Sequence, residues 1–199
     1  GECIKKNAVE LNWNAQQTEK IGYAHFMLKE IYEQPYAVAA AMEPHIDVSS
    51  QVIRLKNVGF GRIPQELNKL DYDEDWQNTL KVLKAVEKIF IVACGTSFYA
   101  GQIGKYLIER LAQVSVETDI ASEFRYRMPV LSKKTLVVTI SQSGETADTL
   151  AAIRLAKERG LTTLSICNVP NSTIDREAHG HLYLNSGPEI GVASTKAFS

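Results

Sequence analysis

The sequence predicts an α/β fold: a doubly wound, five-stranded parallel sheet with an N-terminal helical extension. From residue 88 onward, short apolar runs alternate with segments of helical periodicity. Continuous apolar runs are typical of parallel strands covered on both faces. Two of these runs end in turns rich in Ser and Thr, each followed by a helix. Ligands in open α/β sheets bind at such turns, outside the carboxyl ends of the strands.

The first 87 residues carry weaker patterns. Pro35 lies inside a segment of helical periodicity, so we expect a boundary or kink near Gln34 rather than one straight helix. Gly59-Phe60-Gly61 has no third glycine and no following helix, so it does not indicate a dinucleotide site. In order, we expect a polar linker over 1–20, a helical segment over 23–42, an irregular segment over 44–70 and a short helix over 75–85.

The sheet and its helices are expected after residue 87. The apolar runs predict strands over residues 89–93, 114–118, 136–140, 161–167 and 182–184. The first strand leads into a helix over 98–112, and the third leads into a helix from Ala147 that closes at Gly160, a residue suited to a helix C-terminus. The segment Ser172-Thr173-Ile174-Asp175 fits a capping box.

The turn after the third strand, Ser141-Gln142-Ser143-Gly144-Glu145-Thr146, is the most informative stretch. It offers three hydroxyls, one amide and a glycine that allows close backbone approach. It also lies at a helix N-terminus, where unpaired N–H groups and the helix dipole favour an anion. We interpret it as a sugar-phosphate pocket without a fixed positive charge. The alternative is that Ser143 or Thr146 only caps the helix, although capping and ligand binding are compatible.

Other phosphate and nucleophile motifs fit this turn poorly. The P-loop pattern GxxxxGK[ST] is absent, and no lysine lies within the turn. The nucleophile elbow GxSxG requires glycine where this chain has Ser141. Glu145 is expected to be a first-turn helix residue favoured by the helix dipole.

Composition excludes several classes of function. The net charge of -1, with no basic block, argues against binding to nucleic acid. No run approaches the roughly 18 apolar residues of a membrane helix, and no secretory signal opens the chain. The odd number of cysteines without a CxxC pair indicates a cytosolic context, so we expect a cytoplasmic protein. The first residue is Gly1, and the C-terminal pattern stops at Ser199 without a helix end, so we expect a fragment.

The cysteines and histidines give no metal signature. Cys3, Cys94 and Cys167 form no CxxC pair, and the last two end apolar runs, where small buried thiols are the ordinary interpretation. Cys94 lies beside the expected pocket, which leaves a reactive role open. His179 and His181 lack companion ligands at a recognisable spacing, so we interpret them as part of a loop leading into a strand.

Several motifs together resemble a known family. They are HFMLKEIYEQP (25–35), ACGTS (93–97), ASEFRYR (121–127), SQSGETADTL (141–150), CNVPNS (167–172) and EIGVASTKAF (189–198). The SxSGxT turn alone resembles the sugar isomerase (SIS) domains, which bind phosphosugars. KEIYEQP together with EIGVASTKAF more specifically resembles the isomerase region of the glutamine–fructose-6-phosphate aminotransferases.

The resemblance implies an architecture and an activity. That family makes glucosamine 6-phosphate from fructose 6-phosphate and glutamine, with a glutaminase domain followed by two SIS domains and a tail. Members form homodimers through the isomerase region. The chain would then comprise a linker from a missing glutaminase domain (1–20), a helical extension with an irregular segment (21–87) and a first SIS domain truncated at its C-terminus (88–199).

The resemblance also implies site residues. The phosphate would be held by Ser97, Ser141, Gln142, Ser143 and Thr146, and the sugar contacted by Val192 and Ser194, with Gly95, Thr96, Gly144 and Glu145 as supporting residues. The family's Schiff-base lysine, proton-transferring glutamate and ring-opening histidine lie in the second SIS domain and the tail, so no catalytic residue is assigned here. Neither a metal nor an organic cofactor is implied. The fragment is expected to bind fructose 6-phosphate or glucosamine 6-phosphate without turning it over.

Two other functions remain open. A regulatory SIS module would sense a sugar phosphate in the same pocket, but should lack the KEIYEQP and EIGVASTKAF motifs. A stand-alone SIS isomerase would build its site across a dimer and would need an acid or base within this chain. Glu145 and Glu189 are the candidates beside the pocket loops.

Overall fold

The centre of the molecule is a five-stranded parallel sheet, in a computed structural model that describes residues 19–127 and 129–199. The strands follow the spatial order β4-β3-β5-β6-β7. Their bounds are β3 (Lys88–Ala93), β4 (Ser115–Ile120), β5 (Thr135–Ser141), β6 (Thr162–Cys167) and β7 (Gly180–Tyr183). The predicted fold class is confirmed: the chain runs outward from β3 to β4 and then returns to the other side of β3 for β5.

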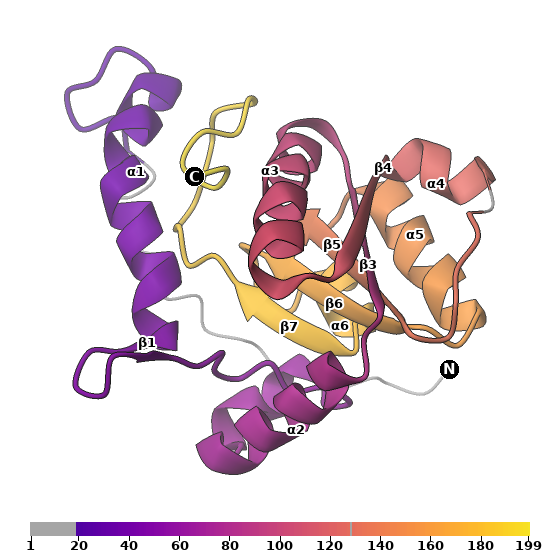
Figure 1. Cartoon of the computed structure of the whole chain (residues 1–199). Coiled ribbons are helices and arrows are strands. Elements are labelled where there is room, and N and C mark those ends of the chain that lie inside the picture. The colour runs from indigo at the N-terminus through magenta and orange to yellow at the C-terminus, as the bar shows by residue number, and fades with distance from the viewer. Residues whose placement is uncertain (1–18, 128) are drawn as a thin grey trace, which may run out of the picture.

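Helices cover both faces of the sheet. One face carries α3 (Gly95–Ala112) and residues of α2 (Tyr72–Lys84), and the other carries α4 (Ala121–Arg127) and α5 (Ala147–Glu158), as Figure 1 shows. Successive residues of β3 alternate between two buried clusters. Phe90 and Val92 pack with Phe124 of α4, whereas Ile91 packs toward the face of α3. This two-sided burial explains the continuous apolar runs in the sequence.

The N-terminal helix α1 (Phe26–Met42) runs through Pro35 without interruption, so the boundary expected near Gln34 is wrong. Proline removes the N–H that would bond to the carbonyl of Ile31 four residues earlier. The Gln34 side chain donates to that carbonyl instead, with Nε2 3.1 Å from the Ile31 oxygen. A side-chain donor therefore satisfies the carbonyl that the proline leaves without its backbone partner.

The segment predicted as irregular contains short elements. They are η2 (Glu43–His45), the antiparallel pair β1 (Ile46–Asp47) and β2 (Val52–Ile53), and η3 (Pro64–Lys69). The helix expected over 75–85 is confirmed but begins earlier, because Asp71 caps it by accepting from the Glu74 N–H. The predicted linker lies outside the described residues as far as residue 18, as does Cys3.

The last strand differs most from expectation. The apolar pattern predicted residues 182–184, but β7 begins at Gly180, so His181 belongs to the strand and not to a loop. The His181 side chain is fully buried, with Nδ1 2.8 Å from Asp175 Oδ1 and Nε2 3.2 Å from the Arg62 carbonyl. A polar residue satisfied on both ring nitrogens can occupy the core, which hydrophobic periodicity does not reveal.

The capping box expected at the start of α6 (Thr173–Glu177) is also wrong. Ser172 occupies the N-cap position, but its side chain makes no cap hydrogen bond. The Asp175 carboxylate instead accepts from the Asn171 N–H at 2.8 Å and from the Tyr183 hydroxyl at 3.0 Å. Asp175 is drawn into the buried network around His181 and is not available to Ser172.

Candidate functional site

Two polar segments meet beside β3 and β5, where the order of the strands in the sheet reverses. β3 and β5 are neighbours, with Ala93 opposite Ile140, so their carboxyl ends lie side by side. The first, Cys94–Ser97, comprises the N-cap and first turn of α3, which begins at Gly95 and not at the expected residue 98, and the second leads from β5 into α5. We call the second one the serine turn (residues 141–146). Because these two strands are neighbours, Ser97 and the serine turn line one pocket of about 360 Å³.

The serine turn is held by bonds within itself. Ser141 Oγ accepts from the Gly144 N–H at 2.9 Å, and Ser143 Oγ accepts from the Glu145 N–H at 3.2 Å. Gly144 has φ +67°, and a Cβ at this position would lie 1.9 Å from Ser172 Oγ, so only glycine fits. The turn is therefore fixed by its own sequence and by close packing beneath it.

Thr146 is the N-cap of α5 by position, yet its side chain makes no cap hydrogen bond. Its hydroxyl instead lies 3.4 Å from Ser141 Oγ. The capping alternative therefore does not account for the Thr146 hydroxyl, which lines the pocket together with Ser97 at the start of α3. Both helices direct their N-termini toward the pocket, which favours an anion there.

A third wall comes from the C-terminal segment, which we call the C-terminal loop (residues 189–196). Glu189 accepts from Ser194 Oγ at 2.8 Å and from the Thr195 N–H at 2.8 Å, closing the loop on itself. Figure 1 shows this segment, in yellow, between α1 and α3. Val192 is fully exposed at the pocket rim. The loop brings the backbone of residues 191–194 opposite the serine turn.

The pocket gathers all seven residues that the sequence resemblance assigned to substrate: Ser97, Ser141, Gln142, Ser143, Thr146, Val192 and Ser194. Of the supporting residues, Gly95 and Thr96 also line it, whereas Gly144 and Glu145 belong to the serine turn but do not line the pocket. Among the described residues that form the pocket there is no Lys, Arg or His. Any anion would be held by hydroxyls, N–H groups and helix dipoles.

Glu145 has a different place from the one expected. It precedes α5, and its carboxylate accepts from the Thr173 N–H of α6 at 2.8 Å. This hydrogen bond lowers the pKa of Glu145 below its ordinary value. Its charge is therefore directed to the start of α6 rather than to its own helix, and it ties the serine turn to the next helical segment.

Sequence reasoning named Glu189 only as a candidate acid or base, and it missed Glu30. Glu189 lines the pocket and organises the C-terminal loop. Glu30 of α1 is nearly buried and accepts from the N–H groups of Ile190 and Gly191. Both residues lie within the motifs that carried the family resemblance, but a contact between residues 160 positions apart leaves no periodic signal in one sequence.

The two described cysteines differ in their surroundings. Cys167 is fully buried, as expected, and burial raises the pKa of its thiol to about 12. Cys94 is partly exposed and lines the pocket, and the Thr149 hydroxyl lies 3.8 Å from its sulfur. Over residues 19–127 and 129–199, no cluster of three or more His, Cys, Asp or Glu residues could hold a metal ion, and no helix has the length and apolarity to cross a membrane.

Comparisons with known proteins agree with this geometry. The profile of the SIS domain family matches residues 82–199. Glutamine–fructose-6-phosphate aminotransferase of Clostridium tetani is 48% identical over 198 residues, covering 100% of this chain and 29% of the relative. The same enzyme of Streptomyces coelicolor is 50% identical over 198 residues, again covering 100% of this chain and 29% of its own length. The chain therefore spans about 30% of these relatives.

A solved structure extends the comparison to three dimensions. The C-terminal domain of glucosamine-fructose-6-phosphate aminotransferase from Francisella tularensis superposes with a TM-score of 0.75 at 41% identity, covering 91% of this chain and 45% of that one. Tagatose-6-phosphate ketose/aldose isomerase from Escherichia coli has a TM-score of 0.64 at 16% identity, covering 88% of this chain and 44% of that one. The second likeness concerns the fold alone.

Proposed function

Because this chain belongs to the SIS domain family, we propose that its pocket binds a hexose phosphate, with the phosphate group on the serine turn. The observation that carries the proposal is the meeting of Ser97, the serine turn and two helix N-termini in one pocket without a lysine or arginine. Neutral hydroxyls and N–H groups can hold a dianionic phosphate when helix dipoles add to them. The C-terminal loop, on the opposite wall, contacts the sugar through Val192 and Ser194.

We further propose that the ligand is fructose 6-phosphate or glucosamine 6-phosphate. The support is the similarity over the whole chain to enzymes named glutamine–fructose-6-phosphate aminotransferase. In this proposal the chain is the first SIS half of the isomerase region of such a cytoplasmic enzyme, which forms a homodimer. Residues 1–20 are its linker, 21–87 its helical extension and 88–199 the SIS domain, with glutaminase and second SIS domains as the partners that complete the enzyme.

The pocket then contributes binding and orientation to the reaction. The phosphate, anchored at one end, fixes the position of C1 and C2 of the sugar at the other end. Ammonia condenses with the C2 carbonyl, whose oxygen leaves as water, to give an imine at C2. Transfer of a proton from C1 to C2, with loss of the C1 hydroxyl proton, then gives an amine at C2 and the aldehyde at C1. We assign the groups that perform these proton transfers to other parts of the enzyme, so the isolated chain binds the sugar phosphate and does not convert it.

The test is a titration of the 199-residue chain with fructose 6-phosphate and with fructose, followed by amide chemical shifts. Fructose 6-phosphate should give saturable shifts at Ser97, in the serine turn and in the C-terminal loop, and fructose should give none. Thr146→Val removes a hydroxyl that caps no helix N–H, so it should weaken binding about three- to tenfold with little change in stability.

Thr162→Val, at the opposite end of β6 from the pocket, is the matched control and should bind as the unaltered chain does. Equal responses to fructose and fructose 6-phosphate would contradict the proposal. So would shifts that leave the serine turn unaffected.

A further inference from the structure

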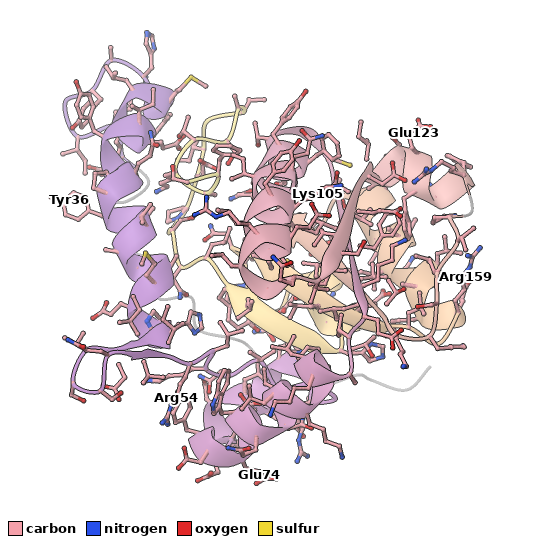
Figure 2. All side chains as sticks on the ribbon, in the orientation of Figure 1. Tyr36, Arg54, Glu74, Lys105, Glu123 and Arg159 are labelled. Atoms are coloured by element: carbon pink, nitrogen blue, oxygen red, sulfur yellow. The ribbon has the colours of Figure 1, made fainter. Side chains whose placement is uncertain are left out.

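The helix α1 buries two charged residues, Lys29 and Glu30, and exposes several of its large apolar side chains. Lys29 and Glu30 are 3% and 2% exposed. The exposed apolar side chains include Met27, Leu28, Ile31, Tyr32 and Tyr36, and Figure 2 shows Tyr36 projecting away from the body of the molecule. Charged side chains are almost never so buried unless they are paired. Charged side chains therefore make specific contacts between α1 and the C-terminal segment, beside the buried Ala37.

Glu30 makes the central contact. Its Oε1 accepts from the Ile190 N–H at 2.6 Å and from the Gly191 N–H at 3.0 Å, and its Oε2 lies 3.1 Å from the same Gly191 nitrogen. Hydrogen bonds to a carboxylate are stronger than those between neutral groups. A Cβ on Gly191 would lie 2.5 Å from Glu30 Oε2, so the glycine permits this close approach.

The other end of the C-terminal loop is also attached to α1. Lys196 Nζ lies 2.7 Å from Glu33 Oε2, and Lys29 Nζ lies 3.5 Å from Glu33 Oε1. Lys196 is only 6% exposed. The loop is therefore fixed to one helix at Ile190 and Gly191 and again at Lys196. The pocket wall formed by residues 191–194 lies between these two points of attachment.

We propose that Glu30 is a positioning residue for the sugar side of the pocket. Its carboxylate holds the backbone of residues 190–191, so that Val192 and Ser194 line the same pocket as the serine turn. The inference rests on the proposed function and adds that the binding site includes α1, which lies outside the part of the chain matched by the SIS family profile. Glu30 acts through the loop and does not itself line the pocket.

A purely structural role for Glu30 makes a different prediction. The serine turn is held by its own hydrogen bonds and by Glu145, at a distance from α1. Loss of the Glu30 carboxylate should therefore displace the C-terminal loop and leave the serine turn in place. If Glu30 only supported overall stability, its replacement would weaken both walls of the pocket together.

The experiment compares the 199-residue chain with its Glu30→Gln and Glu30→Ala variants, by titration with fructose 6-phosphate and amide shifts. In Glu30→Gln one acceptor oxygen is kept, an amide N–H₂ replaces the other, and the negative charge is lost. We expect the dissociation constant to rise about tenfold, and further in Glu30→Ala. At saturation, the shifts at Ser97 and in the serine turn should match those of the unaltered chain, while those at Val192 and Ser194 should be much smaller.

Glu43→Gln removes the same charge from an exposed residue just beyond α1 and is the matched control, with unchanged affinity expected. Urea unfolding of each variant reports whether the chain remains folded. Unchanged affinity in both Glu30 variants would overturn the inference, and so would equal loss of shifts on the two walls. Absence of any response to fructose 6-phosphate in the unaltered chain would contradict the proposed function itself.

Discussion

The two walls of the pocket are built in opposite ways. The serine turn is stabilised by contacts between residues a few positions apart, such as Ser141 with Gly144. The C-terminal loop depends on Glu30 and Glu33, about 160 positions earlier in the chain. The first wall is held by hydrogen bonds within the turn and by packing against the start of α6, whereas the second depends on contacts with α1. The proposed phosphate end of the pocket is therefore fixed mainly by contacts within the serine turn, and the sugar end is fixed by contacts with the distant helix α1.

Gly144→Ala is expected to have the largest effect on stability, because it places a side chain in the tightly packed serine turn. A side chain at φ +67° is strained, and the new Cβ would lie 1.9 Å from Ser172 Oγ. We expect a loss of about 2–5 kcal/mol in the free energy of unfolding, measured in urea. Gly61→Ala is the matched control, since φ is +82° with no atom within 4 Å, and should cost about 1–2 kcal/mol.

Equal losses for the two glycine variants would show that the serine turn is free to expand. The contrast between a tightly packed turn and a loop held from a distance would then lose its basis.

Lys196→Met tests the remote attachment of the C-terminal loop. The lysine is nearly buried, and its partner Glu33 is 30% exposed on its side chain. Removing the charge should cost about 1–3 kcal/mol, less than for a fully buried pair. Lys105→Met is the control, because Lys105 pairs with Glu109 on the surface of α3 at 3.8 Å (Figure 2) and should cost below about 0.5 kcal/mol. Similar losses would mean that the loop needs no tether at that end.

Glu145→Gln is expected to have the smallest effect, and one that depends on pH. The Thr173 N–H lowers the pKa of Glu145 below its ordinary value of 4.5. A carboxyl whose pKa falls on folding stabilises the protein above its ordinary pKa, and this contribution disappears as the pH drops through the lowered value. Because Glu145 is exposed, the gain should stay below about 1 kcal/mol.

Urea unfolding of the unaltered chain and Glu145→Gln at several pH values checks this. The difference in stability should be greatest near neutral pH and should shrink below pH 4.5. A difference that grows on acidification would show that Glu145 does not hold α6 through its charged form.

Patterns that depend on near neighbours were predictable. The apolar run before Ser141 and the helical period after Ala147 placed the serine turn correctly between β5 and α5. The start of α2 could also have been found, since Asp71-Tyr72-Asp73-Glu74 places a capping aspartate three residues before a glutamate. These features arise from steric and hydrogen-bond preferences that act within a few residues.

Sequence patterns gave wrong predictions where a residue forms a specific polar contact in the folded protein. The buried His181 is hydrogen-bonded to the buried Asp175, and the last strand therefore includes Gly180 and His181, which hydrophobic periodicity did not predict. The same contact occupies Asp175, so the predicted capping box does not form. The helix expected to break at Pro35 continues, since one side-chain donor replaces the missing N–H. In each case a specific polar partner outweighed the average preference of the residue type.

By itself, the sequence determined the α/β class, the parallel sheet and the position of the hydroxyl-rich turn at a strand's carboxyl end, because periodicity and turn chemistry act locally. Only the tertiary structure decided that β3 and β5 are neighbours and that Glu30 holds the opposite wall of the pocket. A buried carboxylate without hydrogen-bond donors is strongly destabilising, and the donors to Glu30 are N–H groups about 160 positions away that only the fold brings to it.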